Sequence, residues 1–456
     1  MFEYMEIILN LFGGLAIFLF GMTYMGDGLE NAAGHKLKGF FDKTISNPLS
    51  GAVVGTIVTA IIQSSSATTV MVVGFVNAGL MSLYQSVGVI MGANIGTTIT
   101  GQLVTIKIDD YIPIFLIIGT ILILFGKQER RKEYGKIVFG FGLLFLGLTF
   151  MKDAMAPITE TTIFQDIILM LQGNMFLGIL VGALMTVVVQ SSSASTAILL
   201  SLAATGAISL EVAIPILFGN NIGTCVTAVL SSLNANTTAK KAAFIHLSFN
   251  IIGTIIFLPF IGILSDTVIT IGGAVDRQVA NAHTIFNIIN TIILLPFAGT
   301  FVKFANLVLK ETADDDVKTS RLDPRFLETP SIAFEQAFQE SLTMFELART
   351  NLSIATDALT TNDVSHLKTL YVNEAEINRL ERELSTFLVS ISSHDITEYD
   401  TNRIASMIKI TNDIERVGDH TKNLAELAQE ITTHQLTFST EALEELTMMY
   451  NYTVNA

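Results

Sequence analysis

The chain has 456 residues, of which 50% are hydrophobic and 15% are charged, and its mean hydropathy is +0.55. These values exclude an ordinary soluble globular protein and predict one that crosses a lipid bilayer several times. The net charge of −15 arises near the end of the chain, because residues 311–456 contain 11 of the 26 basic residues and 26 of the 41 acidic ones. We therefore expect a membrane module and an acidic second module, and there is no basic stripe for a nucleic-acid partner.

Seven apolar runs are candidates for membrane spans. They lie near residues 7–25, 84–104, 111–126, 137–151, 211–231, 243–263 and 283–309. The first run is long and no basic residue precedes it, so we expect a retained span rather than a cleaved signal peptide. The membrane module is predicted to occupy residues 1–310.

The membrane module contains an internal duplication. Residues 51–100 match residues 178–227, which lie 127 positions further on, at 19 of 50 positions. The repeated parts are a Gln-Ser-Ser-Ser motif, Gln63–Ser66 and Gln190–Ser193, and a Gly-rich element, Gly92–Thr100 and Gly219–Thr227. Polar, Gly-rich segments at corresponding places in two membrane halves are the best sequence indication of a transporter's substrate site.

The chain before each Gln-Ser-Ser-Ser motif is short for a full span. Residues 49–62 would form a helix of about 21 Å, whereas the hydrocarbon core is roughly 30 Å thick. We predict that Leu49–Met81 and Met175–Ile208 are re-entrant hairpins that carry the motifs into the membrane. Two full spans in each segment is the alternative, which length alone leaves open.

The distribution of basic residues predicts the topology. Twelve of the fifteen Lys and Arg residues before residue 311 fall in the segments 26–48, 127–136, 232–242 and 303–310, which hairpins of this kind place in the cytoplasm. The N-terminus then lies outside the cell membrane (inner or plasma membrane) and the acidic module inside. Three spans separate the hairpins, so repeat 1 (about 26–126) and repeat 2 (about 152–263) are predicted to be inverted, followed by a last span at about 283–309.

The motifs suit an anion and a cation. Helices beginning after the motifs would direct free N–H groups and positive dipole ends at an anion, and no Lys or Arg lies in the predicted spans or hairpins. Asn, Thr and Gly in the second element could offer oxygen atoms to Na⁺. Buried acids are nearly absent, which favours Na⁺ over proton coupling. Ordinary polar contacts between helices are the alternative, and a matched pair of motifs makes that alternative weaker.

A smaller repetition follows the second copy, in the segments His246–Asn250 and His283–Asn287. In each segment the His and the Asn are four residues apart and share one helix face. They could complete the polar site or bond across helices.

The paired motifs, each followed by Asn-Ile-Gly-Thr, resemble those of the type II sodium/phosphate cotransporter family over about residues 1–310. The resemblance implies Na⁺-driven uptake of inorganic phosphate by an inverted-repeat carrier. It implies phosphate binding by Gln63, Ser64, Ser65, Ser66, Gln190, Ser191, Ser192 and Ser193. It implies Na⁺ binding by Thr68, Asn94, Thr97, Thr100, Ser195, Thr196, Asn221, Thr224 and Thr227, with His246, Asn250, His283 and Asn287 in support. The His-Asp box that animal members carry after the first repeat is missing, so the Na⁺ stoichiometry does not follow.

The acidic module begins after a polar linker, residues 311–330. Apolar periodicity predicts amphipathic helices near 331–359, 364–392 and 404–431 in an antiparallel bundle, and a further helical run at 441–450. The segment Asn412–His420 resembles the PhoU phosphate-regulator signature, which implies that Glu415 and Asp419 could hold a divalent or trivalent metal. As surface charges these acids would need no explanation. The resemblance implies a regulatory tail that senses phosphate status, binds a cytoplasmic partner or forms a homo-oligomer.

Three functions are open at this stage. The first is a Na⁺-coupled phosphate carrier, and the second is an exporter of phosphate or a carrier of another tetrahedral oxyanion. The third is a membrane phosphate receptor that signals through the tail, although such a receptor would not need two inverted copies of the site. The membrane module has no nucleophile, base and acid in a catalytic arrangement, so we do not expect an enzyme.

Overall fold

The structure is a computed structural model that describes residues 2–33, 45–233, 235–310, 322–393 and 398–455. Within these ranges the regular structure is entirely helical, which confirms the all-α prediction. The chain separates into two compact units, Met1–Thr319 and Ser320–Ala456. Most of the predicted linker, residues 311–321, lies outside the described residues, and its end forms the short 3₁₀ helix η5 (Pro324–Glu328). The predicted domain limits stay a prediction.

Six helical stretches of the described residues are long and apolar enough to cross a membrane. They are α1 (Phe2–Ala33), α5 (Leu83–Val104), α7 (Glu129–Thr159), α11 with α12 (Leu210–Gly223 and Cys225–Ser232), α13 with α14 (Thr237–Phe257 and Ile261–Ile271) and α15 with α16 (Val275–Leu294 and Ala298–Val308). The last two stretches contain the 3₁₀ turns η2 (Leu258–Phe260) and η3 (Leu295–Phe297), where a proline lacks the N–H that would continue the helix. These stretches confirm a polytopic membrane protein.

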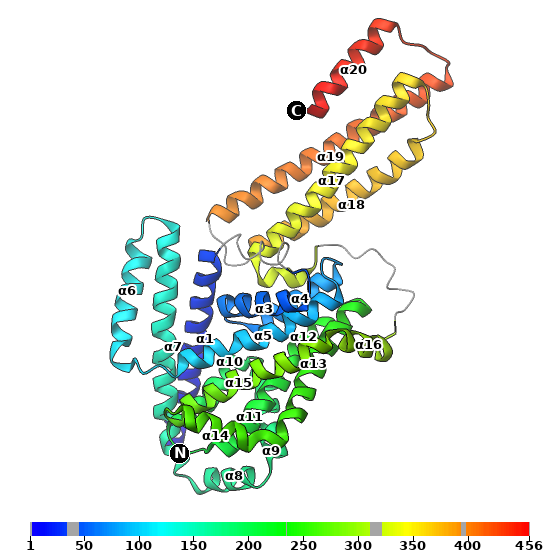
Figure 1. The fold of residues 1–456 in the computed structure, drawn as a ribbon. Helices are drawn as coiled ribbons and strands as arrows, with labels where there is room; N and C mark the ends of the chain where they lie inside the picture. The colour runs from blue at the N-terminus through cyan, green and yellow to red at the C-terminus, as the bar shows by residue number, and fades with distance from the viewer. Residues whose placement is uncertain (1, 34–44, 234, 311–321, 394–397, 456) are drawn as a thin grey trace. The chain divides into compact units, whose positions relative to one another are not determined.

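The predicted span at 111–126 differs from the other six. It forms α6 (Ile112–Phe125), a helix of 14 residues that follows the short turn η1 (Asp109–Tyr111) and packs along α7 (Figure 1). At 1.5 Å per residue it is about 21 Å long, less than the roughly 30 Å of a hydrocarbon core. The inverted orientation of the repeats depended on counting this run as a span, so inversion stays a prediction.

Each repeat contains two short helices and a longer one packed against them. In the first repeat these are α3 (Pro48–Ile62), α4 (Ser65–Asn77) and α5, and in the second they are α9 (Met175–Val189), α10 (Ser192–Ala204) and α11 with α12. Helix α8 (Thr162–Gln172) precedes α9 and makes a bend of 119° with it. Whether the short helices form re-entrant hairpins in a bilayer stays a prediction.

Glycines bring the helices of each repeat into backbone contact. A Cβ atom on Gly92 of α5 would collide with the main chain of Ala52 in α3, and a Cβ on Gly219 of α11 would collide with that of Ile179 in α9. The two glycines are 127 residues apart and therefore equivalent. Close backbone packing through small residues is a common way for helices to associate in membranes. The duplicated glycines thus fix the same scaffold in both repeats.

The second unit confirms the predicted helical module. Helices α17 (Pro330–Thr361), α18 (Leu367–Ser392) and α19 (Glu398–Thr433) pack against one another, and α20 (Thr440–Asn455) follows. Figure 1 shows the first three as long neighbouring helices. Their shared core includes the fully buried Ala355, Leu370 and Ala428.

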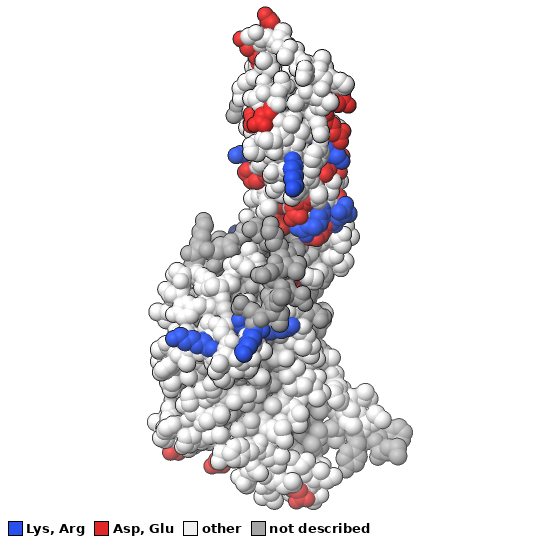
Figure 2. Space-filling view, turned by 90° about the vertical axis from the view of Figure 1, so that its right-hand side faces the viewer, with Lys and Arg blue, Asp and Glu red and all other residues white. Residues whose placement is uncertain are grey.

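Charge is distributed differently on the two units. Figure 2 shows many acidic side chains on the second unit, whereas the face of the first unit in view is mostly uncharged. On that face the basic side chains gather in one band and the acidic ones lie at one end, away from it. Such a separation of sign is compatible with the positive-inside rule, and the orientation of the chain in the membrane stays a prediction.

Candidate functional site

Both Gln-Ser-Ser-Ser motifs interrupt a helix in the same way. Gln63, after α3, has φ 60° and ψ 18°, and Gln190, after α9, has φ 55° and ψ 19°. This left-handed conformation is uncommon for a residue with a side chain, and it often marks functional sites. The Gln63 N–H donates to the Thr59 carbonyl at 2.8 Å and the Gln190 N–H to the Thr186 carbonyl at 2.7 Å. We call these two breaks the glutamine turns.

A new helix begins directly after each glutamine turn. Ser64 is the N-cap of α4, and its Oγ accepts from the Ala67 N–H at 3.1 Å. Ser191 is the N-cap of α10, and its Oγ accepts from the Ala194 N–H at 3.2 Å. The remaining N–H groups of a first turn have no partner within their own helix. Each turn therefore has the donors and the positive dipole end that suit an anion.

The side chains of the two glutamines differ although their backbones match. Gln63 is only 4% exposed, its Oε1 accepts from the Thr100 hydroxyl at 3.0 Å, and its Nε2 donates to the Ala60 carbonyl. Gln190 is exposed, and no described residue hydrogen-bonds its side chain. Thr227, the equivalent of Thr100, donates instead to the Thr224 carbonyl of its own helix at 3.0 Å.

Each repeat is tied by an Asn–Asn bond to one of the His-Asn segments. Asn94 Nδ2 donates to Asn250 Oδ1 at 2.9 Å, and Asn221 Nδ2 donates to Asn287 Oδ1 at 3.4 Å. All four side chains are buried. The first bond joins α5 to α13 and the second joins α11 to α15. The His-Asn segments thus bond across helices in a pattern that follows the duplication.

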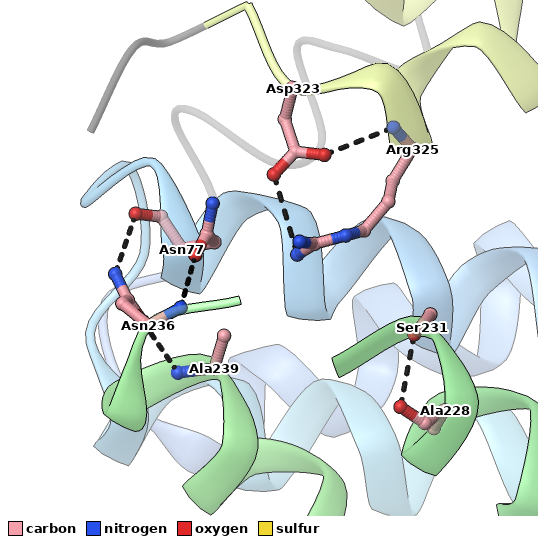
Figure 3. Close-up of polar contacts among 7 residues, drawn as sticks. All are labelled: Asn77, Ala228, Ser231, Asn236, Ala239, Asp323 and Arg325. Carbon is pink, nitrogen blue, oxygen red and sulfur yellow. Dashed lines mark hydrogen bonds and ion pairs between the residues drawn. The ribbon is translucent and has the colours of Figure 1, made fainter. Parts of the chain in front are cut away.

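The helices after the turns also cross between the repeats. Helix α4 packs against α12 of the second copy, and α10 packs against α5 of the first copy. Helix α4 is further tied to α13, because Asn236 donates from its main-chain N–H to Asn77 Oδ1 and from Nδ2 to the Asn77 carbonyl, both at 2.9 Å (Figure 3). The predicted polar residues therefore lie where elements of the two repeats meet.

Several polar atoms in this region are buried and have no partner among the described residues. They are Ser195 Oγ, Thr196 Oγ1, His283 Nδ1 and both ring nitrogens of His246. In the first repeat the hydroxyl equivalent to Ser195 is satisfied, because Thr59 Oγ1 donates to Thr68 Oγ1 at 3.0 Å. Thr97 and Thr224 bond within their helices, to the carbonyls of Ala93 and Asn220. Buried oxygen atoms without partners are suitable ligands for a hard cation.

Thr59 and Thr186 are absent from the predicted site, although they face the turns through their carbonyls and lie in the duplicated segment. Both are buried, at 0% and 1% exposure. Their identity at positions 127 apart is the sequence signal that could have identified them.

The tail residues Glu415 and Asp419 lie near further acidic side chains of the second unit. Partial burial, together with the charges of Asp419, Glu381 and Glu374, raises the pKa of Glu415. Glu374 accepts from Asn378 Nδ2 at 2.9 Å and lies 4.0 Å from Lys422 Nζ. No group of three or more His, Cys, Asp or Glu side chains among the described residues is arranged to hold a metal ion. The metal that the PhoU resemblance implies stays a prediction.

Comparisons with known proteins agree with these features. A relative from Escherichia coli (strain K12), named "Putative inorganic phosphate export protein YjbB", is 27% identical over 446 residues, covering 97% of this chain and 82% of the relative. The "Uncharacterized protein YqeW" of Bacillus subtilis (strain 168) is 32% identical over 257 residues, covering 56% of this chain and 83% of the relative. The human "Sodium-dependent phosphate transport protein 2B" is 36% identical over 101 residues, covering 22% of this chain and 15% of the relative. No solved structure matches the chain.

Two family profiles match the chain. The PhoU domain profile matches residues 342–428. The Na⁺/Pi-cotransporter profile matches residues 17–153 and 157–290, which together are more than half of the chain and contain both glutamine turns. These matches confirm both resemblances seen in the sequence, and they indicate a transporter rather than an enzyme. The chain is a member of the Na⁺/Pi-cotransporter family that also carries a PhoU domain.

Proposed function

We propose that this protein is an alternating-access carrier that moves inorganic phosphate across the cell membrane together with Na⁺. The observation that supports this most strongly is the pair of glutamine turns, which share their backbone conformation and their serine caps. A static receptor would need one such site, whereas a carrier built from two repeats uses both.

Phosphate is held by neutral groups in this proposal. Its ligands are the side chains and first-turn N–H groups of Gln63–Ser66 and Gln190–Ser193. Hydrogen bonds from oriented dipoles bind an anion without the strong charge pairing of a buried arginine. Such binding is compatible with release on the other side of the membrane.

Sodium is bound by oxygen atoms near the turns. The proposed ligands are those of Thr68, Asn94, Thr97, Thr100, Ser195, Thr196, Asn221, Thr224 and Thr227. The unpartnered hydroxyls of Ser195 and Thr196 support this assignment, because buried oxygens without hydrogen bonds are stabilised by a cation. Sodium is here a transported substrate.

Phosphate export is the second candidate. It is favoured by one specific observation, that the E. coli relative covering 97% of this chain is named as an export protein. The human relative, named as sodium-dependent, covers only 22% of this chain. The two candidates share the site and differ in the direction of net flux.

The test is radiolabelled phosphate flux in proteoliposomes with the Na⁺ gradient directed inward, directed outward, or absent. Coupled transport requires that accumulation of phosphate follows the direction of the Na⁺ gradient and stops when choline replaces Na⁺. Phosphate flux that ignores Na⁺ and follows a proton gradient would reject the proposed coupling. Binding of phosphate with no flux under any gradient would favour the receptor.

The PhoU domain is proposed to regulate this flux from the cytoplasm, with the N-terminus of the chain outside. Its separation as a compact unit supports a regulatory rather than a transport role. A chain that ends near residue 312 is expected to keep Na⁺-dependent flux and to lose its response to internal phosphate. Complete loss of flux in a folded truncated carrier would contradict this role.

A further inference from the structure

His283 lies at the meeting point of the two repeats and is 2% exposed. Its Nε2 contacts Asn221 Oδ1 at 3.1 Å, and its Nδ1 has no partner among the described residues. A Cβ atom on Gly101 would lie 3.9 Å from His283 Nδ1 and 3.9 Å from the Thr196 methyl group. The unpartnered Nδ1 therefore faces both α5 and α10, next to Gly101 of α5.

The hydrogen bonds determine which ring nitrogen of His283 carries the proton. The main-chain carbonyl of His283 can only accept, so the Asn287 atom 2.9 Å from it is the donor Nδ2. Asn287 Oδ1 is then the acceptor for Asn221 Nδ2, which leaves Asn221 Oδ1 facing the ring. Because that oxygen also can only accept, Nε2 carries the proton.

The other nitrogen, Nδ1, is consequently a bare acceptor in the neutral ring. A buried acceptor without a hydrogen bond is unfavourable, so a hydrogen-bond donor is expected to approach Nδ1 in the working protein. Sodium cannot donate a hydrogen bond. Phosphate near neutral pH can, because it retains at least one P–OH group, whereas sulfate has none.

We infer that His283 is a specificity-determining residue whose Nδ1 accepts a hydrogen bond from the P–OH group of bound phosphate. This inference rests on the proposed function and adds a reason for rejecting sulfate and similar oxyanions without a proton. A site built to receive a hydrogen bond discriminates strongly against a ligand that cannot make it, because the buried partner is left unsatisfied.

The other Asn–Asn pair, Asn94 with Asn250, lacks the same arrangement. Position 228 of the second copy, equivalent to Gly101 of the first copy, is Ala228 and carries the methyl group that Gly101 lacks. His246 has both ring nitrogens unpartnered, and so its tautomer is not fixed by a bond to Asn94. Selection for a protonated anion is therefore assigned to His283 alone.

The test compares anions as competitors of radiolabelled phosphate flux in the full-length protein in proteoliposomes at neutral pH. Monofluorophosphate has the charge and nearly the shape of hydrogen phosphate but carries fluorine in place of the hydroxyl group. In the wild-type protein, monofluorophosphate and sulfate should compete at least about tenfold more weakly than phosphate, whereas arsenate, which keeps a hydroxyl, should compete well. Equal competition by monofluorophosphate and phosphate would overturn the inference.

Two variants sharpen the test. His283→Gln keeps a donor for Asn221 but removes Nδ1, so the preference for phosphate over sulfate should fall by about tenfold. Gly101→Ala makes no close contact but places a methyl group between Nδ1 and Thr196, and it should weaken phosphate competition. Whatever its effect on flux, the matched variant His246→Gln should keep the wild-type preference.

The outcomes separate this inference from the proposed function. Phosphate flux with an unchanged anion preference in His283→Gln and Gly101→Ala would overturn the role of His283 alone. Equal loss of preference in His246→Gln and His283→Gln would also overturn it. Absence of phosphate binding and flux in the wild-type protein would reject the proposed function and this inference with it.

Discussion

The two copies of the duplicated segment have the same backbone and different side-chain environments. Both glutamines are left-handed and both following serines cap a helix. Gln63 is buried against Thr100, however, whereas Gln190 is exposed and Thr227 bonds within its own helix. The repeated sequence therefore specifies the backbone of the turn, and the packing around each turn specifies whether its glutamine side chain is buried or exposed. We expect a carrier that alternates between two states to exchange these two environments.

The largest expected effect is on stability, and it tests the backbone scaffold that the two repeats share. Gly92→Ala and Gly219→Ala each place a Cβ atom against a neighbouring main chain, so each should destabilise the carrier by about 3 kcal/mol, the upper end of the usual overpacking cost. Thermal unfolding in detergent measures this loss. Gly262→Ala is the control, because its Cβ would meet nothing within 4 Å. Similar stability of all three variants would show that the backbone contacts are not required.

The glutamines themselves test the part that differs. Gln63→Ala and Gln190→Ala should each lower phosphate flux by about 100-fold or more, since each removes a proposed ligand of the transported anion. Only Gln63→Ala should also lower stability, by about 1 kcal/mol, because only Gln63 has a buried hydrogen bond to Thr100. Flux assays and unfolding midpoints are measured on the same preparations. Wild-type flux in both variants would remove the glutamine turns from the site.

The threonine pair gives a smaller and more specific effect. Thr100→Val leaves Gln63 Oε1 without its donor and should cost about 1 kcal/mol of stability in the absence of Na⁺. Thr227→Val breaks only a bond within its own helix and should change stability by a few tenths of a kcal/mol. Both variants should require more Na⁺ for half-maximal flux if both hydroxyls bind Na⁺. If Thr100→Val and Thr227→Val lose the same stability, the side chains of the two glutamine turns have the same environment, which would contradict the comparison.

The tail provides a reference that should leave both repeats unchanged. Burial and nearby acids raise the pKa of Glu415, so its contribution to tail stability is present below its unfolded-state pKa and is lost as the pH rises through the raised folded-state value. At neutral pH Glu415→Gln should therefore be more stable than the wild type, by less than about 1 kcal/mol because the side chain is largely solvated. Near pH 4 the two proteins should have equal stability. Unfolding of the tail followed against pH measures this, with unchanged phosphate flux as the control.

Much of the scaffold was predictable because helices leave strong sequence signals. Apolar periodicity predicted α17, α18 and α19 to within a few residues at most ends, and the polar motifs marked the interruptions after α3 and α9. The serine caps follow from the preference of serine for the residue before a helix. The run at 111–126 forms α6 with nearly the predicted bounds, but apolar character alone does not show whether a helix of 14 residues crosses the bilayer.

The details of the site were less predictable, for two physical reasons. Left-handed glutamine is contrary to local preference and is maintained by the surrounding fold, so composition gives no indication of it. The difference between Gln63 and Gln190 arises between identical Gln-Ser-Ser-Ser motifs, so it depends on the different residues that pack around each turn. The bond of Asn221 to His283 likewise joins residues 62 positions apart.

The glycine contacts have a consequence for how the chain folds. Helices α3 and α5 meet within residues 48–104, and α9 meets α11 within residues 175–223, so the closest backbone contacts of each repeat are local in sequence. Local contacts form quickly because little loop entropy is lost in closing them. The first repeat can therefore assemble its core while the ribosome is still synthesising the second. The Asn–Asn bonds to α13 and α15 would then join two finished halves late in biogenesis, as the last helices emerge.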